Sequence, residues 1–202
     1  MFLTACREVG KNVGETVSTD VFETVTGKDA FIPPDDAANE FGKEANSLTK
    51  NTGNEHMAAM YSVDVFGNRV YFNGNIYAGE NNNVVAPFLL TSTAGALLEK
   101  ATLGGIQYEG FTHTHPDDKQ SGNWNWQFSD FQSNGILNGG GDQGAAILAG
   151  RSYMVEQTGK LYEITRETAA SALLAGEGIN TKDASGNYKY RMDYGTTGGE
   201  IY

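Results

Sequence analysis

Two of the three histidines of the chain, His113 and His115, stand one residue apart in the run "EGFTHTHPDD". The residues around them are β-prone, and side chains at positions i and i+2 of a strand point to the same face, about 6.6 Å apart along it. Two imidazoles at that spacing can converge on one metal ion, with metal–nitrogen distances of about 2.0–2.1 Å. The pair therefore predicts a metal site at the end of a strand.

The third ligand of such a site is expected to be a carboxylate. A catalytic zinc ion takes three protein ligands and keeps a fourth position for water, and the chain has no cysteine near the histidines. Asp117 and Asp118 follow His115 so closely that convergence on the same ion is awkward. Asp130 returns after a loop and reaches the ion more naturally, so it is the favoured ligand.

Aromatic residues precede this acid in the loop. Trp124, Trp126 and Phe128 alternate with polar residues just before Ser129. They are consistent with a loop that aromatic side chains pin onto the core. The alternative is an aromatic wall, with Trp124 and Trp126 as substrate-binding residues that grip an extended peptide beside the metal.

The composition of the 202-residue chain narrows the class of protein. Fourteen basic residues against 25 acidic ones give a net charge of −11, which disfavours binding to a nucleic-acid backbone and favours a basic protein partner. A single cysteine, Cys6, excludes an internal disulfide. No apolar run approaches the ~18 residues of a membrane span. The opening "MFLTAC" resembles a lipobox, but the charged and apolar parts of a signal peptide are missing, which favours Met1 as the start of an excised C-terminal domain.

The elements that must position the site form a single-domain mixed α/β fold. A helix is expected after Asp35 or Asp36, either of which can cap it. The other expected elements are hairpins over 55–79 and 152–165, a strand over 104–116, a buried strand over 143–150, and helices over 88–103 and 167–178. Residues 1–33 are interpreted as a linker or N-terminal arm, 34–178 as the metal-dependent catalytic domain, and 179–202 as a C-terminal tail.

The motif "HTHP" followed by Ser129 and Asp130 resembles the signature of JAMM (MPN/JAB-type) metallopeptidases. Over residues 35–165 the chain is similar to the JAMM-like domain at the C-termini of Rhs-repeat polymorphic toxins. The segments that carry the resemblance are "DDAANEFGKEAN", "NEHMAAMYSVDVFGNRVYF", "GFTHTHPDD", "FSDFQ" and "LAGRSYMVEQTGKLYEI". The resemblance implies a JAMM/MPN-like (cytidine-deaminase-like) central sheet flanked by helices.

The resemblance also implies roles for individual residues. His113 and His115 match the two histidine ligands of the metal ion, usually zinc, and Glu55 matches the general base. Ser129 matches the serine that helps to stabilise the oxyanion. The family's carboxylate ligand falls three residues after that serine, where this chain has Gln132. Ligation by Asp130 would therefore need a rewired turn.

Two further residues compete for roles near the metal. Glu109 lies four residues before His113, so on a regular strand it shares the metal-facing side and is a rival for the base or an outer partner of the ligands. His56 alternates to the strand face opposite Glu55, which makes it an incidental histidine.

The function implied by the resemblance is that of a zinc-dependent hydrolase, of peptidase or isopeptidase type, acting as the toxin domain of a bacterial Rhs-type protein. Its partners would be a protein or peptide substrate and a cognate immunity protein, and it would act as a secreted effector inside a target cell. The alternative is a degenerate, non-catalytic JAMM-like domain that binds a protein partner. Amidohydrolase and PHP-type sites need more histidines than this chain has, and a zinc deaminase needs a P-C-x-x-C element that is absent.

Overall fold

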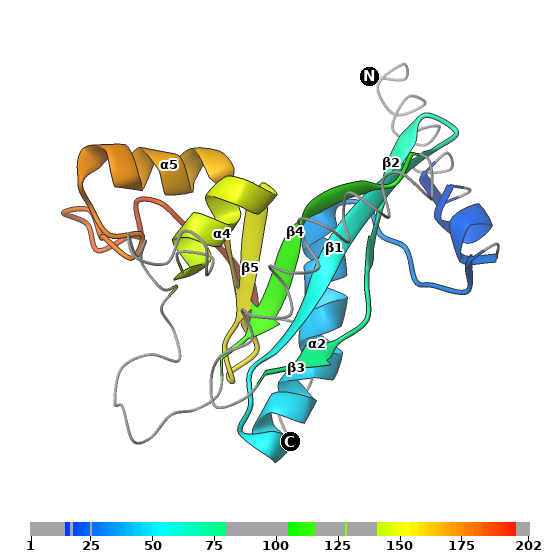
Figure 1. Ribbon diagram of the computed structural model, residues 1–202, viewed down its shortest axis with the longest axis horizontal. Helices are drawn as coiled ribbons and strands as arrows, with labels where there is room; N and C mark the ends of the chain where they lie inside the picture. The colour runs from blue at the N-terminus through cyan, green and yellow to red at the C-terminus, as the bar shows by residue number, and fades with distance from the viewer. Residues whose placement is uncertain are drawn as a thin grey trace, which may run out of the picture.

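The computed structural model describes residues 15–16, 18–24, 26–79, 105–115, 128 and 141–196. Within these residues the protein is a mixed α/β fold in which helices pack on both faces of one sheet (Figure 1). The α/β class expected from the sequence is confirmed.

The helices are α2 (Pro34–Thr52), α4 (Gly141–Ala149) and α5 (Arg166–Ala175), and residues 18–24 are also helical. The strands are β1 (His56–Val65), β2 (Asn68–Asn73), β3 (Tyr77–Ala78), β4 (Gln107–Thr114), β5 (Arg151–Val155), β6 (Lys160–Thr165) and β7 (Met192–Thr196). Both predicted hairpins, β1–β2 and β5–β6, are present.

The strands of the described part of the chain form a sheet in the order β2-β1-β4-β5-β6-β7, and β3 pairs with one end of β1. Strands β4 and β5 run parallel, and parallel neighbours need a crossover connection, usually a helix. Helix α4 lies in that connection. The prediction of a buried strand over 143–150 is therefore wrong, because a short apolar run does not by itself distinguish a strand from a buried helix.

Helix α2 covers one face of the sheet, which we call the α2 face; in Figure 1 it runs behind β1 and β4. The helix begins after Pro33 and has no side-chain cap, so the expectation that Asp35 or Asp36 caps it is wrong. Both acids lie in the first turn, where they complement the helix dipole. It ends at Gly53, whose positive φ of 71° closes the last turn. Its buried apolar side chains pack on Ala58 and Met60 of β1, and they are Ala37, Ala38, Phe41 and Ala45.

Helices α4 and α5 cover the opposite face, which we call the α4 face. Ala145 of α4 packs on Met57 and Phe111, so alternate residues of β1 face α4 and α2. A second cluster joins α4 and α5 to β5 and β6; its buried members are Phe128, Ala146, Met154, Tyr162, Ile164, Ala169, Ala172 and Ile179. At the far end of β2, Phe22 and Ala30 of the N-terminal segment pack on Val70 and Phe72.

The segment after residue 178, expected to be a tail, takes part in the fold. Ile179 is fully buried, and β7 pairs antiparallel with β6. The sheet therefore gains an edge strand that the glycine- and tyrosine-rich sequence did not indicate. Among the helices of the described residues, none is both long and apolar enough to cross a membrane.

Candidate metal centre

The pairing of β1 with β4 brings Glu55 to the two histidines. Met57 lies opposite His113 in the antiparallel ladder. Glu55, two residues before Met57, therefore lies on the same α4 face. His113 and His115 share that face as well, and the centres of their rings are 4.9 Å apart. The spacing of the two histidines thus has the effect expected from the sequence.

The ligand atoms of these three side chains lie close together. The Nε2 atoms of His113 and His115 are 3.1 Å apart. Glu55 Oε1 lies 3.9 Å from Nε2 of His113 and 3.7 Å from Nε2 of His115. Among the described residues, this is the group whose ligand atoms all fall within 4.8 Å of one another and could hold a metal ion.

A second carboxylate, from Asp142, lies beside His113 but outside this group of three. Asp142 lies in the first turn of α4, and its Oδ1 atom is 3.3 Å from Nε2 of His113. Asp142 was not among the predicted site residues, because the apolar run that follows it is typical of a buried strand. Acidic residues are enriched in the first turn of helices, so the position of Asp142 before the apolar residues of "NGGGDQGAAILAG" was a signal for a helix.

His113 is held with its Nε2 atom toward the two carboxylates. The side chain is only 1% exposed, and its Nδ1 atom lies 3.5 Å from Ser152 Oγ on β5. Burial lowers the pKa of His113 to about 4, although Asp142 and a hydrogen bond with the backbone of Tyr153 act in the opposite direction. The imidazole is therefore neutral at pH 7, which is the form that binds a metal ion.

The separations can be compared with those of a tetrahedral site. Ligands at about 2.0–2.1 Å from an ion lie about 3.3–3.4 Å from one another in that geometry. The distances of 3.1 Å between the histidines and 3.3 Å from Asp142 to His113 match this value, whereas those from Glu55 are longer. Asp142 has this spacing to His113 but is not one of the three residues whose ligand atoms all lie within 4.8 Å of one another, which are Glu55, His113 and His115.

Glu109, the rival for the base, lies on the other face of the sheet. Met60 pairs with Gly110 and Tyr61 pairs with Tyr108, so Glu109 is the extra residue of a β-bulge. Gly110 has a φ of 145°, and a Cβ atom there would overlap the backbone of Arg151.

The bulge reverses the alternation of β4. Glu109 accepts hydrogen bonds from Ser62 Oγ at 2.5 Å and from Arg69 Nη1 at 3.3 Å. The expectation that it shares the face of His113 is therefore wrong.

His56 lies on the α2 face, as expected from its alternation with Glu55. It is 4% exposed, and its Nδ1 atom lies 2.9 Å from Thr49 Oγ1. The third histidine is thus part of the interior and not part of the candidate metal centre.

Four predicted site residues, Trp124, Trp126, Ser129 and Asp130, lie outside the described residues, as does Gln132. Phe128 is described and is 1% exposed. Its ring meets that of His113 edge-on at 6.1 Å, and its backbone exchanges two hydrogen bonds with the side chain of Asn180, of 3.2 and 2.7 Å. For this aromatic residue, the interpretation as an anchor of the loop agrees with the structure.

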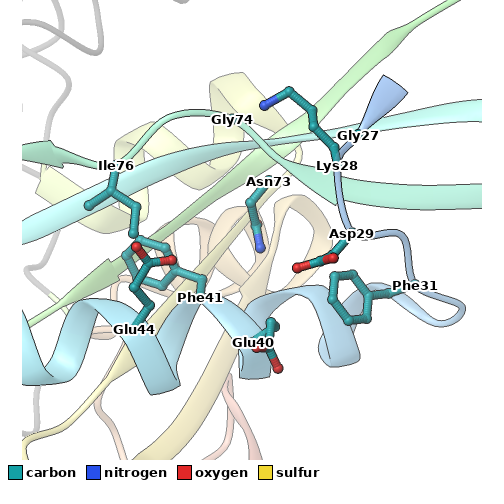
Figure 2. Close-up of a pocket in the computed structure, with 10 residues that line it drawn as sticks. All are labelled: Gly27, Lys28, Asp29, Phe31, Glu40, Phe41, Glu44, Asn73, Gly74 and Ile76. Carbon is teal, nitrogen blue, oxygen red and sulfur yellow. The ribbon is translucent and has the colours of Figure 1, made fainter. Parts of the chain in front are cut away.

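A pocket of about 220 Å³ lies between α2, the end of β2 with the residues that follow it, and residues 27–31 (Figure 2). It is lined by Gly27, Lys28, Asp29, Phe31, Glu40, Phe41, Glu44, Asn73, Gly74 and Ile76. Figure 2 shows the carboxylates of Asp29 and Glu44 on opposite sides of Asn73, and Glu40 bonds Lys43 at 2.7 Å. These acids do not converge on one point, and the pocket contains no residue of the candidate metal centre.

Comparison of the chain with family models and with curated proteins finds no match.

Proposed function

We propose that the protein is a zinc-dependent hydrolase of peptidase or isopeptidase type with a JAMM/MPN-like domain. The observation that carries the proposal is the convergence of His113 and His115 Nε2 at 3.1 Å, with two carboxylates within 4 Å of His113. The H-T-H-P motif at these positions agrees with that fold and chemistry.

In this proposal the ligands of the ion are His113, His115 and Asp142, and the Asp142 carboxylate, 3.3 Å from His113, turns toward His115 when the ion binds. Two imidazoles and one carboxylate form a donor set of known catalytic zinc sites, in which a fourth position stays open. Side chains of His115, Glu55 and Asp142 are 13–15% exposed, so the cluster is not sealed from solvent on this side.

The base in the proposed reaction is Glu55. Zinc at this place would polarise a substrate carbonyl and lower the pKa of a nearby water molecule toward ~7. Glu55 accepts the proton of the attacking water and then delivers it to the leaving amine. Ser129, by its match to the JAMM signature, helps to stabilise the negative charge that develops on the carbonyl oxygen.

The biological setting we propose is that of a toxin domain from a bacterial Rhs-type protein. It would be a secreted effector that acts on a protein or peptide in a target cell and is neutralised by an immunity protein in the producer. The support is the similarity of residues 35–165 to such domains. The net charge of −11 agrees with a basic protein partner.

Metal analysis of natively purified protein tests the proposal. We expect about one equivalent of zinc per chain in the wild type, and loss of zinc in His113→Ala. Thr112→Val, on the neighbouring position of the same strand, is the control and should retain zinc. Absence of metal from the wild type, before and after addition of zinc, would favour the alternative of a non-catalytic domain that binds a protein partner.

A further inference from the structure

A buried polar cluster lies on the α2 face, behind the candidate metal centre. It consists of Thr49 of α2, His56 of β1 and Thr114 of β4, and we call it the Thr49–His56–Thr114 cluster. The two threonines are fully buried and His56 is 4% exposed. Buried polar groups are costly unless they are hydrogen-bonded, so a group of three at the ends of two strands needs an explanation.

The members of the cluster bond one another. Thr49 Oγ1 lies 2.9 Å from His56 Nδ1 and makes a short hydrogen bond with Thr114 Oγ1. Thr114 Oγ1 also accepts a hydrogen bond of 3.0 Å from the backbone N–H of His56. The consecutive elements α2 and β1 are thereby joined at one point to β4, which is distant in sequence.

The contacts define the proton on the histidine. Nδ1 of His56 lies 3.0 Å from the carbonyl oxygen of Asn54, which can only accept. Nδ1 therefore carries a proton, and the hydroxyl proton of Thr49 is left for the bond with Thr114. Each group in this series of hydrogen bonds therefore has a fixed role as donor or acceptor, and such a network favours one arrangement of the side chains.

The cluster alternates along the chain with the proposed ligands and base. Thr114 stands between His113 and His115, and His56 follows Glu55. Because neighbouring strand residues point to opposite faces, the hydrogen bonds on the α2 face set the relative positions of the strand ends that carry the site on the α4 face.

We infer that Thr49 and Thr114, through His56, are positioning residues that hold the ends of β1 and β4 together, fix the relative positions of His113, His115 and Glu55, and set the affinity of the two histidine ligands for the metal ion. The inference rests on the proposed function. Outer partners that orient metal ligands change metal affinity by about 10–100-fold when they are removed. Thr49 is the most informative member because it belongs to another element and adjoins no proposed ligand in sequence.

The chain offers a matched control. Thr112 is fully buried on the same face of β4, two residues before Thr114, and among the described residues its Oγ1 atom has no hydrogen-bond partner. Thr112→Val and Thr114→Val therefore remove the same group from the same strand, but only the second breaks the cluster. Thr114→Ser retains the hydroxyl.

The experiment measures zinc affinity by competition with a chelating dye, together with the visible spectrum of the cobalt(II)-loaded protein. We expect Thr49→Val and Thr114→Val to weaken zinc binding by about 10–100-fold and to alter the cobalt spectrum. Thr112→Val and Thr114→Ser should remain close to the wild type in both measurements. Urea unfolding of the metal-free proteins identifies any variant that does not fold. If Thr114→Val does not fold, the zinc affinity of Thr49→Val tests the inference.

A purely structural cluster gives a different pattern. Thr49→Val and Thr114→Val would then lower the free energy of unfolding but bind zinc as tightly as Thr112→Val, with an unchanged cobalt spectrum, and the inference would be overturned. Failure of the proposed function is seen separately, as a wild-type protein that binds neither metal.

Discussion

On the α2 face of the sheet, Glu109 and Glu163 each bond an arginine side chain. Arg69 lies 3.3 Å from Glu109, and Arg151 lies 3.2 Å from Glu163. On the α4 face, Glu55 and Asp142 instead lie 3.9 and 3.3 Å from Nε2 of His113. The same type of side chain, at similar depth in neighbouring strands and helices, therefore has two kinds of partner.

The difference between the faces lies in how the negative charge is balanced. An arginine stays protonated at all ordinary pH values, so the carboxylates on the α2 face are neutralised within the protein. His113 is neutral at pH 7 because burial lowers its pKa to about 4, so it does not balance the charge of Glu55 or Asp142. A divalent cation would do so. The comparison teaches that carboxylates beside neutral imidazoles are better candidates for metal binding than carboxylates bonded to an arginine.

The largest effect is expected from removing the carboxylate of Glu55 on the α4 face, with removal of the Glu109 carboxylate on the α2 face as the control. Glu55→Gln removes the proposed base, and loss of a general base slows a reaction by about 10²–10⁴-fold. If the protein is a toxin domain, as we propose, its expression in bacterial cytoplasm should arrest growth, and Glu55→Gln should abolish that arrest. Glu109→Gln, the matched change on the α2 face, should leave growth arrest intact. Equal toxicity of both variants would remove Glu55 from the mechanism.

A second test uses the titration of His113 in the metal-free protein. Its pKa is about 4 in the folded state and about 6.5 in an unfolded chain, so the unfolded state binds more protons between these values. The free energy of unfolding should therefore fall by about 3 kcal/mol as the pH drops from 6.5 to 4. Urea unfolding of wild type and His113→Gln at several pH values, with a chelator present, measures the difference. An identical pH dependence in both proteins would contradict the buried, neutral imidazole.

A third test distinguishes the role of Asp142 from that of Glu55 on the α4 face. Asp142→Asn removes a proposed direct ligand and should weaken zinc binding by about 100-fold or more, the upper end of the effect of an outer partner. Glu55→Gln should retain zinc, because its oxygen lies farther from both imidazoles. Competition titrations with a chelating dye compare the two. Loss of zinc only in Glu55→Gln would mean that Glu55 is the ligand and that Asp142 is not.

The smallest effect is expected on the α2 face. Glu109→Gln weakens the bonds to Ser62 and Arg69, and we expect it to lower the free energy of unfolding by about 1 kcal/mol. Its zinc affinity should equal that of the wild type. A large loss of zinc in this variant would mean that the two faces are not independent.

The elements that carry the histidines follow directly from the sequence. The β-prone run before Pro116 predicts β4, and the turn around Gly67 predicts the β1–β2 hairpin. Glu55, His113 and His115 could therefore be brought together from pattern and resemblance alone. Local patterns are sufficient here because period-two alternation and tight turns act over a few residues.

The parts of the fold and of the site that the sequence did not predict depend on contacts between distant segments. The role of Asp142 depends on the crossover between β4 and β5, which the apolar run over 143–150 does not reveal. The position of Glu109 depends on a bulge, for which Gly110 within a strand is only a hint. Strand β7 follows from pairing with β6 and not from its own composition.

The most direct test of the account is a crystal of the protein grown with zinc and measured at the zinc absorption edge. The account predicts an anomalous peak within about 2.0–2.1 Å of the Nε2 atoms of His113 and His115, with an oxygen of Asp142 at a similar distance. Imidazole rings turned apart, with no peak between them at saturating zinc, would contradict it.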